Sequence, residues 1–440
     1  MIDAIKVMTD AGLWAQESVL PDVPWLKFVA WFVVFLGVFP GIVAYMVWAE
    51  RKVAARFQDR IGPNRVGPLG LLQPIADAIK LLTKEDIVPK EADGWVHLIS
   101  PMLLIVSAFL VLAVVPFGVG LAPVNLPSGM LYLVAVSSLS SLGVFLAGWS
   151  SRNKYSLLGS MRAVAQLVSY EIPQVLATVP IILWTGGLSL VALFYRQMEF
   201  GWFVASPPGL VAFVMFMIAS IAEVNRTPFD LPEAESEIIA GYHTEYSSMR
   251  FGLFFLAEYL SVFGVSCVAT ALFLGGGSPL PFSDFPLGLL GETTASYVLV
   301  NAILLGVFFG KVAFFVFFMF WIRVTLPRMR VDKLMTFAWK ALVPLGIVNI
   351  MAAAVWFECY MRTGKPFVLF GVVMRGNVPL IGLPIPWTWL ISSFLTLIVL
   401  VPAIAALYVV NRPAKIAEVG LGAEPKSAAE APVAAPLLIS

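Results

Sequence analysis

The sequence predicts an all-α membrane protein, a polytopic bundle of about nine transmembrane helices. Of its 440 residues, 60% are hydrophobic and 12% are charged, whereas soluble domains are roughly 45–50% apolar and about 25% charged. A core of this chain length could not bury so many apolar side chains, but a bilayer can accept them, and a crossing helix needs roughly 20 such residues. Nine segments meet that length, at about residues 25–48, 98–116, 130–149, 163–185, 208–224, 251–275, 296–321, 339–357 and 385–410.

The distribution of lysine and arginine predicts how the bundle is oriented. The loops after the first, third and seventh spans carry eight, three and four of these residues, whereas the loops after the second, fourth and sixth carry none, one and none. Because basic loops stay in the cytoplasm, we expect a multi-pass protein of the inner (plasma) membrane with its N-terminus outside and its C-terminus in the cytoplasm. The loop at 358–384 carries three basic residues on the outer side and departs from the rule.

No stretch of the chain has the composition of a soluble domain. We expect an N-terminal segment at 1–24 without the features of a signal peptide, and a transmembrane core at 25–357. An extra loop and span follow at 358–416. The tail at 417–440 is rich in Ala, Pro and Glu and is expected to be disordered.

Several kinds of site are excluded by composition. The net charge of +1 gives no basis for binding nucleic acid. The two cysteines, Cys267 and Cys359, cannot hold a zinc or iron–sulfur centre, which needs about four ligands. Phosphate-binding, dinucleotide-binding and HExxH zinc motifs are missing. Any redox metal is therefore expected on another chain.

The first cytoplasmic loop, at 49–96, contains a turn-rich segment, GPNRVGP, and then LLQPIADAIKLLTKE. The second segment places apolar residues on one helical face and polar residues on the other, which predicts a helix lying along the membrane interface. Glu50 and Arg51, where the first span ends, are on their own most simply interpreted as an interfacial pair.

Glu171, Glu258 and Lys311 are ionisable residues that lie well inside predicted spans. Each costs a few kcal/mol or more in hydrocarbon. Such a residue can be half of a structural pair, but it is a functional candidate by default.

The loop at 223–250 is acidic. It has one basic residue, Arg226, before its last position, and six acids: Glu223, Asp230, Glu233, Glu235, Glu237 and Glu245. Asp230 and Glu233 fit a helix capping box. The remaining carboxylates repel one another, so that some of them are expected to exchange protons near neutral pH. His243, in the same loop, is by itself more typical of a hydrogen-bonded structural residue.

Long motifs in these loops resemble one known family. AERKVAARFQDRIGPNRVGPLGLLQPIADAIKLLTKE, SLLGSMRAVAQLVSYEIP, EVNRTPFDLPEAESEIIAGYHTEYSSMRFGLFFLAEY and WIRVTLPRMRVDKLM are similar to the H-type membrane subunit of NADH:quinone oxidoreductase, respiratory complex I. The resemblance covers about residues 25–356, and the extra span and tail lie beyond it.

The resemblance implies a quinone tunnel and a route for proton coupling, contributed by the loops at 49–96, 150–162, 223–250 and 322–338. The tunnel residues implied are Glu50, Arg51, Arg226, Asp230, Glu233, Arg330 and Asp332. The coupling residues implied are Arg162, Glu171, Glu223, Glu235, Glu237, Glu258 and Tyr259. The family usually has Tyr between the equivalents of Arg330 and Asp332, where this chain has Val331.

The same resemblance implies no catalytic residue, metal or cofactor in this chain alone. Quinone, such as ubiquinone, would be the substrate, and the iron–sulfur clusters, FMN and NADH would lie on partner subunits. The expected partners are the quinone-site and iron–sulfur subunits of the peripheral arm, the small membrane subunits and the lipid bilayer. As part of a translocase, the chain would be inert in isolation.

Two other functions stay open at this point. A homologous membrane subunit of a membrane-bound hydrogenase or formate hydrogenlyase would share many of these residues. A stand-alone ion transporter could also place Glu and Lys within its spans, although the paired repeats common in transporters are missing.

Overall fold

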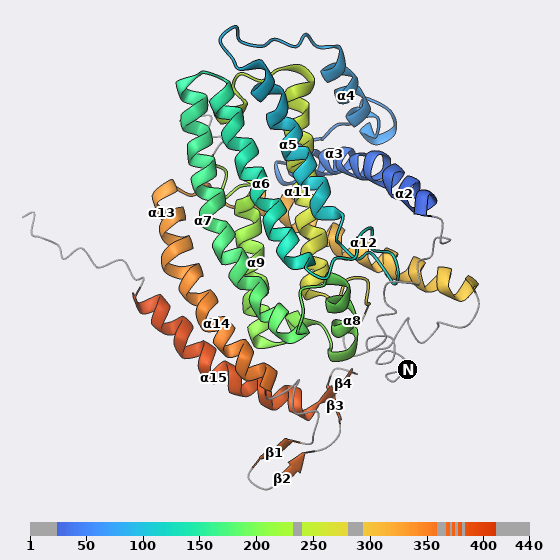
Figure 1. The fold of residues 1–440 in the computed structure, drawn as a ribbon, viewed down its shortest axis with the longest axis vertical. Coiled ribbons are helices and arrows are strands. Elements are labelled where there is room, and N and C mark those ends of the chain that lie inside the picture. The colour runs from blue at the N-terminus through green and yellow to red at the C-terminus, as the bar shows by residue number, and fades with distance from the viewer. Residues whose placement is uncertain are drawn as a thin grey trace, which may run out of the picture.

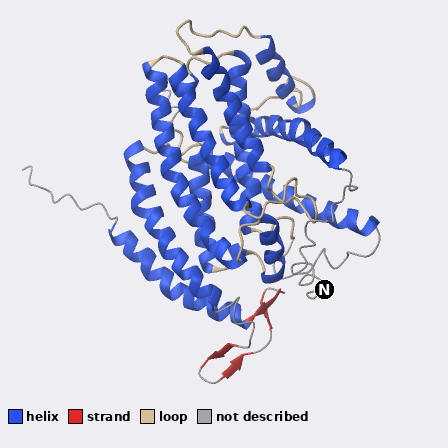
Figure 2. Cartoon of the chain, viewed as in Figure 1, coloured by secondary structure: helices blue, strands red, loops and turns tan. Residues whose placement is uncertain are grey.

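The computed structural model describes residues 24–231, 240–279, 294–358, 367–369, 372–374, 377–380 and 383–410. Within these ranges the chain is a bundle of long helices (Figures 1 and 2). The predicted N-terminal segment, apart from its last residue, and the tail at 417–440 lie outside the described residues.

Seven helices are long and apolar enough to cross a membrane, which agrees with seven of the predicted spans. They are Phe28–Phe57, Gly94–Leu112, Gly129–Ser150, Lys154–Thr185, Ser248–Phe273, Val298–Thr325 and Val331–Trp356. The predicted span at 208–224 falls on the shorter apolar helix Pro207–Glu223, and the one at 385–410 contains the apolar segment Ser392–Leu407 of the helix Trp387–Val410. The prediction of a polytopic helical bundle is therefore confirmed.

The first span is built from three consecutive elements: α2 (Pro24–Val33), the π-helical turn η2 (Val34–Val38) and α3 (Phe39–Phe57). The upright part of the bundle in Figure 1 contains α5 (Gly94–Leu112), α6 (Gly129–Ser150), α7 (Lys154–Thr185), α9 (Pro207–Glu223) and α11 (Ser248–Phe273). α12 (Thr294–Thr325) runs at a steep angle to these helices.

The last part of the bundle lies against α7 and α9. It consists of α13 (Val331–Phe337), the π-helical turn η7 (Ala338–Leu342), α14 (Val343–Trp356) and α15 (Trp387–Val410). Short helices connect the spans: η3 (Pro68–Gly70), α4 (Gln73–Thr83), α8 (Leu190–Phe200), η4 (Phe203–Ala205) and η5 (Gly241–His243).

Two small hairpins lie in the loop before α15. β1 (Phe367–Leu369) pairs antiparallel with β2 (Val372–Met374), and β3 (Asn377–Leu380) pairs antiparallel with β4 (Leu383–Pro386). In register, Val368 lies opposite Val373, and Val378 lies opposite Ile385. These strands, which the sequence pattern does not predict, are three or four residues long and leave the helical architecture unchanged.

Aromatic side chains join the first span to the rest of the bundle. The rings of Phe39 and Phe263 are 5.7 Å apart, and those of Phe117 and Phe308 are 5.4 Å apart. All four side chains are at most 3% exposed. Packing of this kind fixes α3 against α11, so that residues on the two helices can meet.

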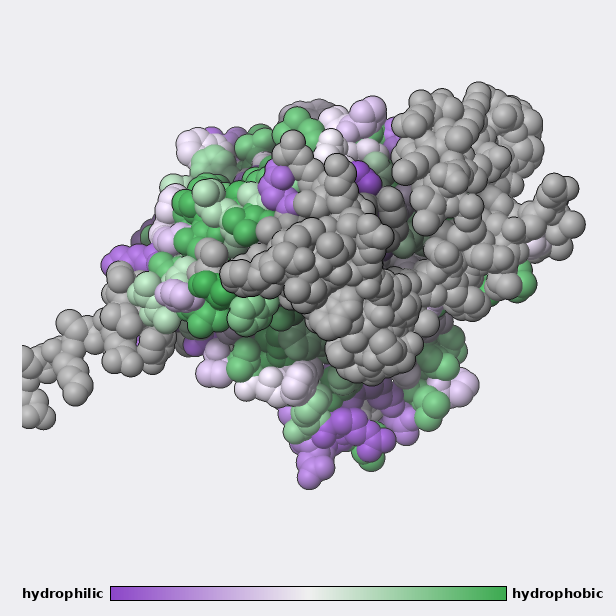
Figure 3. Space-filling view, turned by 90° about the horizontal axis from the view of Figure 1, so that it is seen from below, coloured by the Kyte–Doolittle hydropathy of each residue, from purple (hydrophilic) through white to green (hydrophobic). Residues whose placement is uncertain are grey.

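The outside of the bundle is apolar, as a lipid-facing surface requires. Phe28, Leu131, Phe314 and Phe394, from four different helices, are 70%, 63%, 62% and 65% exposed. Seen from below, hydrophobic residues cover much of the surface left visible around the grey atoms, and hydrophilic residues gather at its edges (Figure 3).

Candidate functional site

A cluster of buried charges lies where α3, α11, α12 and the start of the acidic loop meet. Glu50 of α3 is 7% exposed and Arg226 is 6% exposed. Arg226 Nη1 lies 3.2 Å from Glu50 Oε1, and Arg226 Nε lies 2.7 Å from Glu258 Oε1. Arg323 of α12 also pairs with Glu50. Buried charges are stable only when paired in this way, so these four residues form one unit.

Arg226 is also held by an aromatic ring. Its guanidinium carbon lies 4.3 Å from the ring centroid of Tyr259, close enough for a cation–π contact. Burial opposes the charge on Arg226, but the neighbouring Glu258 and Glu50 outweigh it and raise the pKa of Arg226 above its ordinary value. Arg226 therefore remains a fixed cation between two carboxylates.

The turn that carries Arg226 is fixed by a buried amide on α7. Gln166 Nε2 donates to the carbonyls of Ala222 and Phe229, each at 2.7 Å. α9 ends at Glu223, and Asn225 takes a left-handed backbone conformation with φ 53°. Asn tolerates that conformation better than most residues. Gln166 thereby sets the position of the start of the acidic loop.

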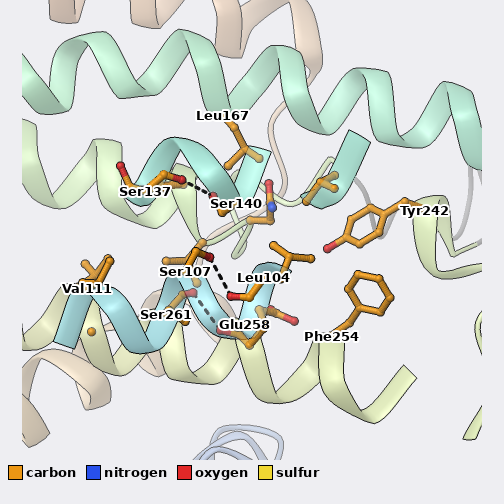
Figure 4. Close-up of a pocket in the computed structure, with 18 residues that line it drawn as sticks. Leu104, Ser107, Val111, Ser137, Ser140, Leu167, Tyr242, Phe254, Glu258 and Ser261 are labelled. Atoms are coloured by element: carbon orange, nitrogen blue, oxygen red, sulfur yellow. Dashed lines mark hydrogen bonds between the residues drawn. The ribbon is translucent and has the colours of Figure 1, made fainter. Parts of the chain in front are cut away.

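A second feature of the site is a series of small cavities inside the bundle. The first holds about 80 Å³ and is lined by Glu258, which Figure 4 labels, and by Glu223. The second, of about 60 Å³, is lined by Glu223 and Glu171. A third, of about 10 Å³, lies between the same two acids. A water needs roughly 10–15 Å³ on this measure, so the first two cavities can each hold several waters.

Serine hydroxyls of α6 line these cavities beside the acids. Ser137 borders all three cavities, and Ser138 donates a hydrogen bond to Glu171 Oε1. Ser140 borders the first cavity, together with Ser107 and Ser261 (Figure 4). Hydroxyls both donate and accept hydrogen bonds, so this lining can order water between the carboxylates.

Glu223 occupies the junction of the three cavities. Its Oε2 is buried and has no hydrogen-bond partner among the described residues. A buried carboxylate oxygen in that situation is expected to bind water or a proton. Glu171 lines two of the same cavities and is close enough to interact electrostatically with Glu223.

The structure separates some residues that the resemblance groups together. Arg51 does not face Glu50. It is 48% exposed and pairs with Asp77 of α4 at 2.6 Å. Arg330 and Asp332 are both exposed, and the hydrogen bond that Arg330 accepts from Leu334 N, at 3.0 Å, is made by its backbone carbonyl. These three residues therefore lie outside the buried charged cluster.

The remaining predicted residues either lie elsewhere in the described structure or fall outside the described residues. Arg162 on α7 and Asp230 in the acidic loop are partly buried. Glu245 accepts a hydrogen bond of 2.7 Å from Asn153 Nδ2. Glu233, Glu235 and Glu237 lie outside the described residues, so the proposed capping box stays a prediction.

His243 is structural, as predicted, but its side-chain contacts among the described residues are with aromatic rings and not the hydrogen bonds that its context favoured. Its ring packs edge-on against Phe254 with 5.1 Å between centroids, and the residue is 6% exposed. Burial lowers the pKa of His243 to about 3. It is therefore neutral at physiological pH and cannot serve as a proton carrier there.

Arg323 and the α6 serines are residues of the site that were not predicted from the sequence. Arg323 was counted only as an orientation signal. The serines carried a usable signal, because SSLSS at 137–141 is unusually polar for a predicted span. Among the described residues no group of three or more His, Cys, Asp or Glu side chains is placed to hold a metal ion.

The chain is similar in sequence to proteins of one known family. The sequence profile of a family described as NADH dehydrogenase matches residues 30–354. A protein from Dehalococcoides mccartyi (strain CBDB1), named as the H-type subunit of NADH-quinone oxidoreductase, is 46% identical over 331 residues, which are 75% of this chain and 87% of that protein.

Two further relatives carry the same name. The protein of Brevibacillus brevis is 46% identical over 345 residues, which cover 77% of this chain and 97% of that protein. The protein of Leptospira biflexa (strain Patoc 1 / Ames) is 44% identical over 362 residues, which cover 77% of this chain and 99% of that protein. α15 lies beyond the residues that the family profile matches.

Proposed function

This chain belongs to the NADH dehydrogenase family and is a membrane subunit of NADH-quinone oxidoreductase, and from that premise we propose that it completes the quinone-binding chamber and couples quinone reduction to proton transport. The observation that carries the proposal is the contact between two features. Glu258 both pairs with Arg226 in the charged cluster and lines the first acid cavity.

The charged cluster is the part of the proposal that faces the quinone. Glu50, Arg226 and Arg323 hold fixed charges in a poorly solvated place, where a nearby change of charge acts over a longer distance than in water. We place the quinone headgroup beside this cluster, with Asp230, Glu233, Arg330 and Asp332 contributed by the adjacent loops. Reduction of the quinone and its protonation would then alter the balance of charge at Glu258.

The cavities provide the path along which that change is transmitted. Glu258 and Glu223 share the first cavity, and Glu223 and Glu171 share the second. A proton taken up by one acid favours the charged state of its neighbour, because like charges no longer oppose each other. Water ordered by the α6 serines would connect the three carboxylates. Arg162, Glu235, Glu237 and Tyr259 complete the proposed coupling set.

The isoprenoid tail would lie along apolar surface next to α4. In α4 the side chains of Ile75, Ile79 and Leu82 are 53%, 55% and 66% exposed. The opposite face carries Asp77, which pairs with Arg51 on α3. An outward apolar face fits contact with lipid or a quinone tail.

We assign quinone reduction itself to partner subunits. The iron–sulfur clusters, FMN and the NADH site would lie there, with the loops that follow the first, third, fifth and seventh spans facing them in the cytoplasm. The N-terminus would then be outside and the C-terminus inside.

Glutamine variants of the two deepest acids test the coupling. In the assembled complex, Glu171→Gln and Glu223→Gln should lower the number of protons moved per NADH oxidised at least about threefold, because amides cannot relay protons. Glu358→Gln, an exposed acid after α14, is the matched control and should match wild type. Proton transport and quinone reduction at wild-type levels in both acid variants would disprove the coupling role.

A further inference from the structure

Lys311 is the one predicted intramembrane ionisable residue that the proposed coupling route does not use. It lies on α12, is partly buried, and its ammonium donates to three carbonyls just past the end of α11. The distances from Nζ are 2.6 Å to Leu274 O, 3.0 Å to Gly276 O and 2.5 Å to Ser278 O. The same Nζ lies 4.2 Å from the ring centroid of Trp202. The amine of Lys311 is thus held at one end of the bundle.

The backbone groups at the end of α11 can form hydrogen bonds with neutral partners. Backbone amides of Leu274 and Gly276 already donate to Thr270 O, at 3.2 Å and 3.0 Å. Gln197, a neutral residue, donates to Ala271 O at 2.7 Å and accepts from Gly275 N at 2.8 Å. Neutral donors can therefore satisfy this helix end, whereas an ammonium adds a cost of desolvation in a membrane.

The position of Lys311 suggests why a cation is there. The second acid cavity is lined by Glu223 and Glu171 and also by Leu272 near the end of α11. Leu272 precedes Leu274, a carbonyl partner of Lys311, by two residues, which is about 3 Å along a helix axis. The second cavity thus reaches the last turn of α11, the helix whose end Lys311 binds.

Apolar side chains complete the barrier at this end. Phe273 is 0% exposed, and its ring lies 5.4 Å from that of Phe213 and 5.5 Å from that of Phe216. Apolar packing excludes water, but a proton-conducting cavity next to it still needs protection against leakage. A positive charge supplies that protection because it repels hydronium, as fixed charges do in selective pores.

We propose that Lys311 is an electrostatic seal, which stops protons from leaving the acid-lined cavities at the far end of the bundle. The inference rests on the proposed function, since it treats those cavities as a proton route. A unit charge about 8 Å from a hydronium ion, at an effective dielectric near 20, lowers its local concentration on the order of 30-fold. The seal keeps a resting complex from dissipating the gradient that it generates.

The test is the passive proton permeability of the resting complex in liposomes. Purified complex is reconstituted around a trapped pH-sensitive dye, a potassium diffusion potential is imposed with valinomycin, and proton entry is followed without NADH. Lys311→Gln keeps an amide donor but loses the charge, and Lys311→Arg keeps the charge. We expect Lys311→Gln and Lys311→Met to leak at least about tenfold faster than wild type, with Lys311→Arg close to wild type. Lys340→Met, which removes an exposed lysine from η7, is the matched control.

Several outcomes would overturn the seal. A complex with Lys311→Gln that is as tight as wild type would make the lysine a hydrogen-bonding cap only. If neutral variants do not assemble, Lys311→Met combined with Gln197→Lys returns a cation to the same helix end. A leak from that variant, or its failure to assemble, would also refute the proposal.

The seal and the proposed coupling fail in different measurements. Adding Glu223→Gln to Lys311→Gln should suppress the leak, because the leak would pass through that acid. An undiminished leak would place the pathway elsewhere and refute the seal. Failure of the coupling role appears instead in the protons moved per NADH by the single Glu171→Gln and Glu223→Gln variants during turnover.

Discussion

Replacing Arg226 by methionine tests whether the buried charged cluster is a single electrostatic unit. The change removes the cation that lies 2.7 Å from Glu258 and 3.2 Å from Glu50. Glu50 retains its pair with Arg323, so the carboxylate most affected is Glu258. Because both Arg226 and Glu258 are less than one-fifth exposed, their attraction is only weakly screened by solvent.

The expected magnitude follows from that geometry. Two unit charges about 4 Å apart interact by about 4 kcal/mol at an effective dielectric near 20, and removing one partner of a buried pair costs roughly 3–5 kcal/mol. In a large domain about 2 °C is lost per kcal/mol. The midpoint of thermal inactivation of the assembled complex should therefore fall by about 6–10 °C in Arg226→Met.

The double variant separates charge from packing. Arg226→Met with Glu258→Gln leaves the Glu50–Arg323 pair in place and should recover at least half of the lost stability. Arg323→Met should cost less than Arg226→Met, since Glu50 then keeps Arg226. An inactivation midpoint unchanged in Arg226→Met, or not improved by the second substitution, would refute the single-unit interpretation.

Two further predictions concern single side chains. Ser138→Ala removes the hydrogen bond to Glu171, which is worth roughly 1.5–3 kcal/mol when the acceptor is charged, and it should lower the protons moved per NADH while quinone reduction continues. Ser392→Ala on α15, whose hydroxyl donates to Trp389 O in its own helix turn, is the control, and equal proton yields in both would contradict the role of Ser138. His243 has a pKa lowered to about 3 by burial, so below pH 6.5 the unfolded chain binds a proton that the folded chain does not. Stability should fall as the pH drops, by roughly 2 kcal/mol at pH 5 from this residue, and His243→Phe should lose less stability between pH 7.5 and pH 5 than wild type. Parallel acid-inactivation profiles would show that His243 is not buried in its neutral form.

The sequence by itself determined the helical bundle, because length and apolarity alone decide which segments can cross a bilayer. Its loop motifs also placed the chain in its family, and its intramembrane acids Glu171 and Glu258 proved to line cavities. These properties can be predicted from the sequence because each depends on residues that are close together in the chain.

Only the tertiary structure decided which charges meet. Glu50 pairs with Arg226 and Arg323, which are 176 and 273 residues away, and not with its neighbour Arg51, because successive residues on a helix point in different directions. The link between Gln166 and the acidic loop, the serine lining of the cavities, and the carbonyls around Lys311 likewise join separate helices. Such contacts depend on how the helices pack, which the local pattern of apolar residues does not specify.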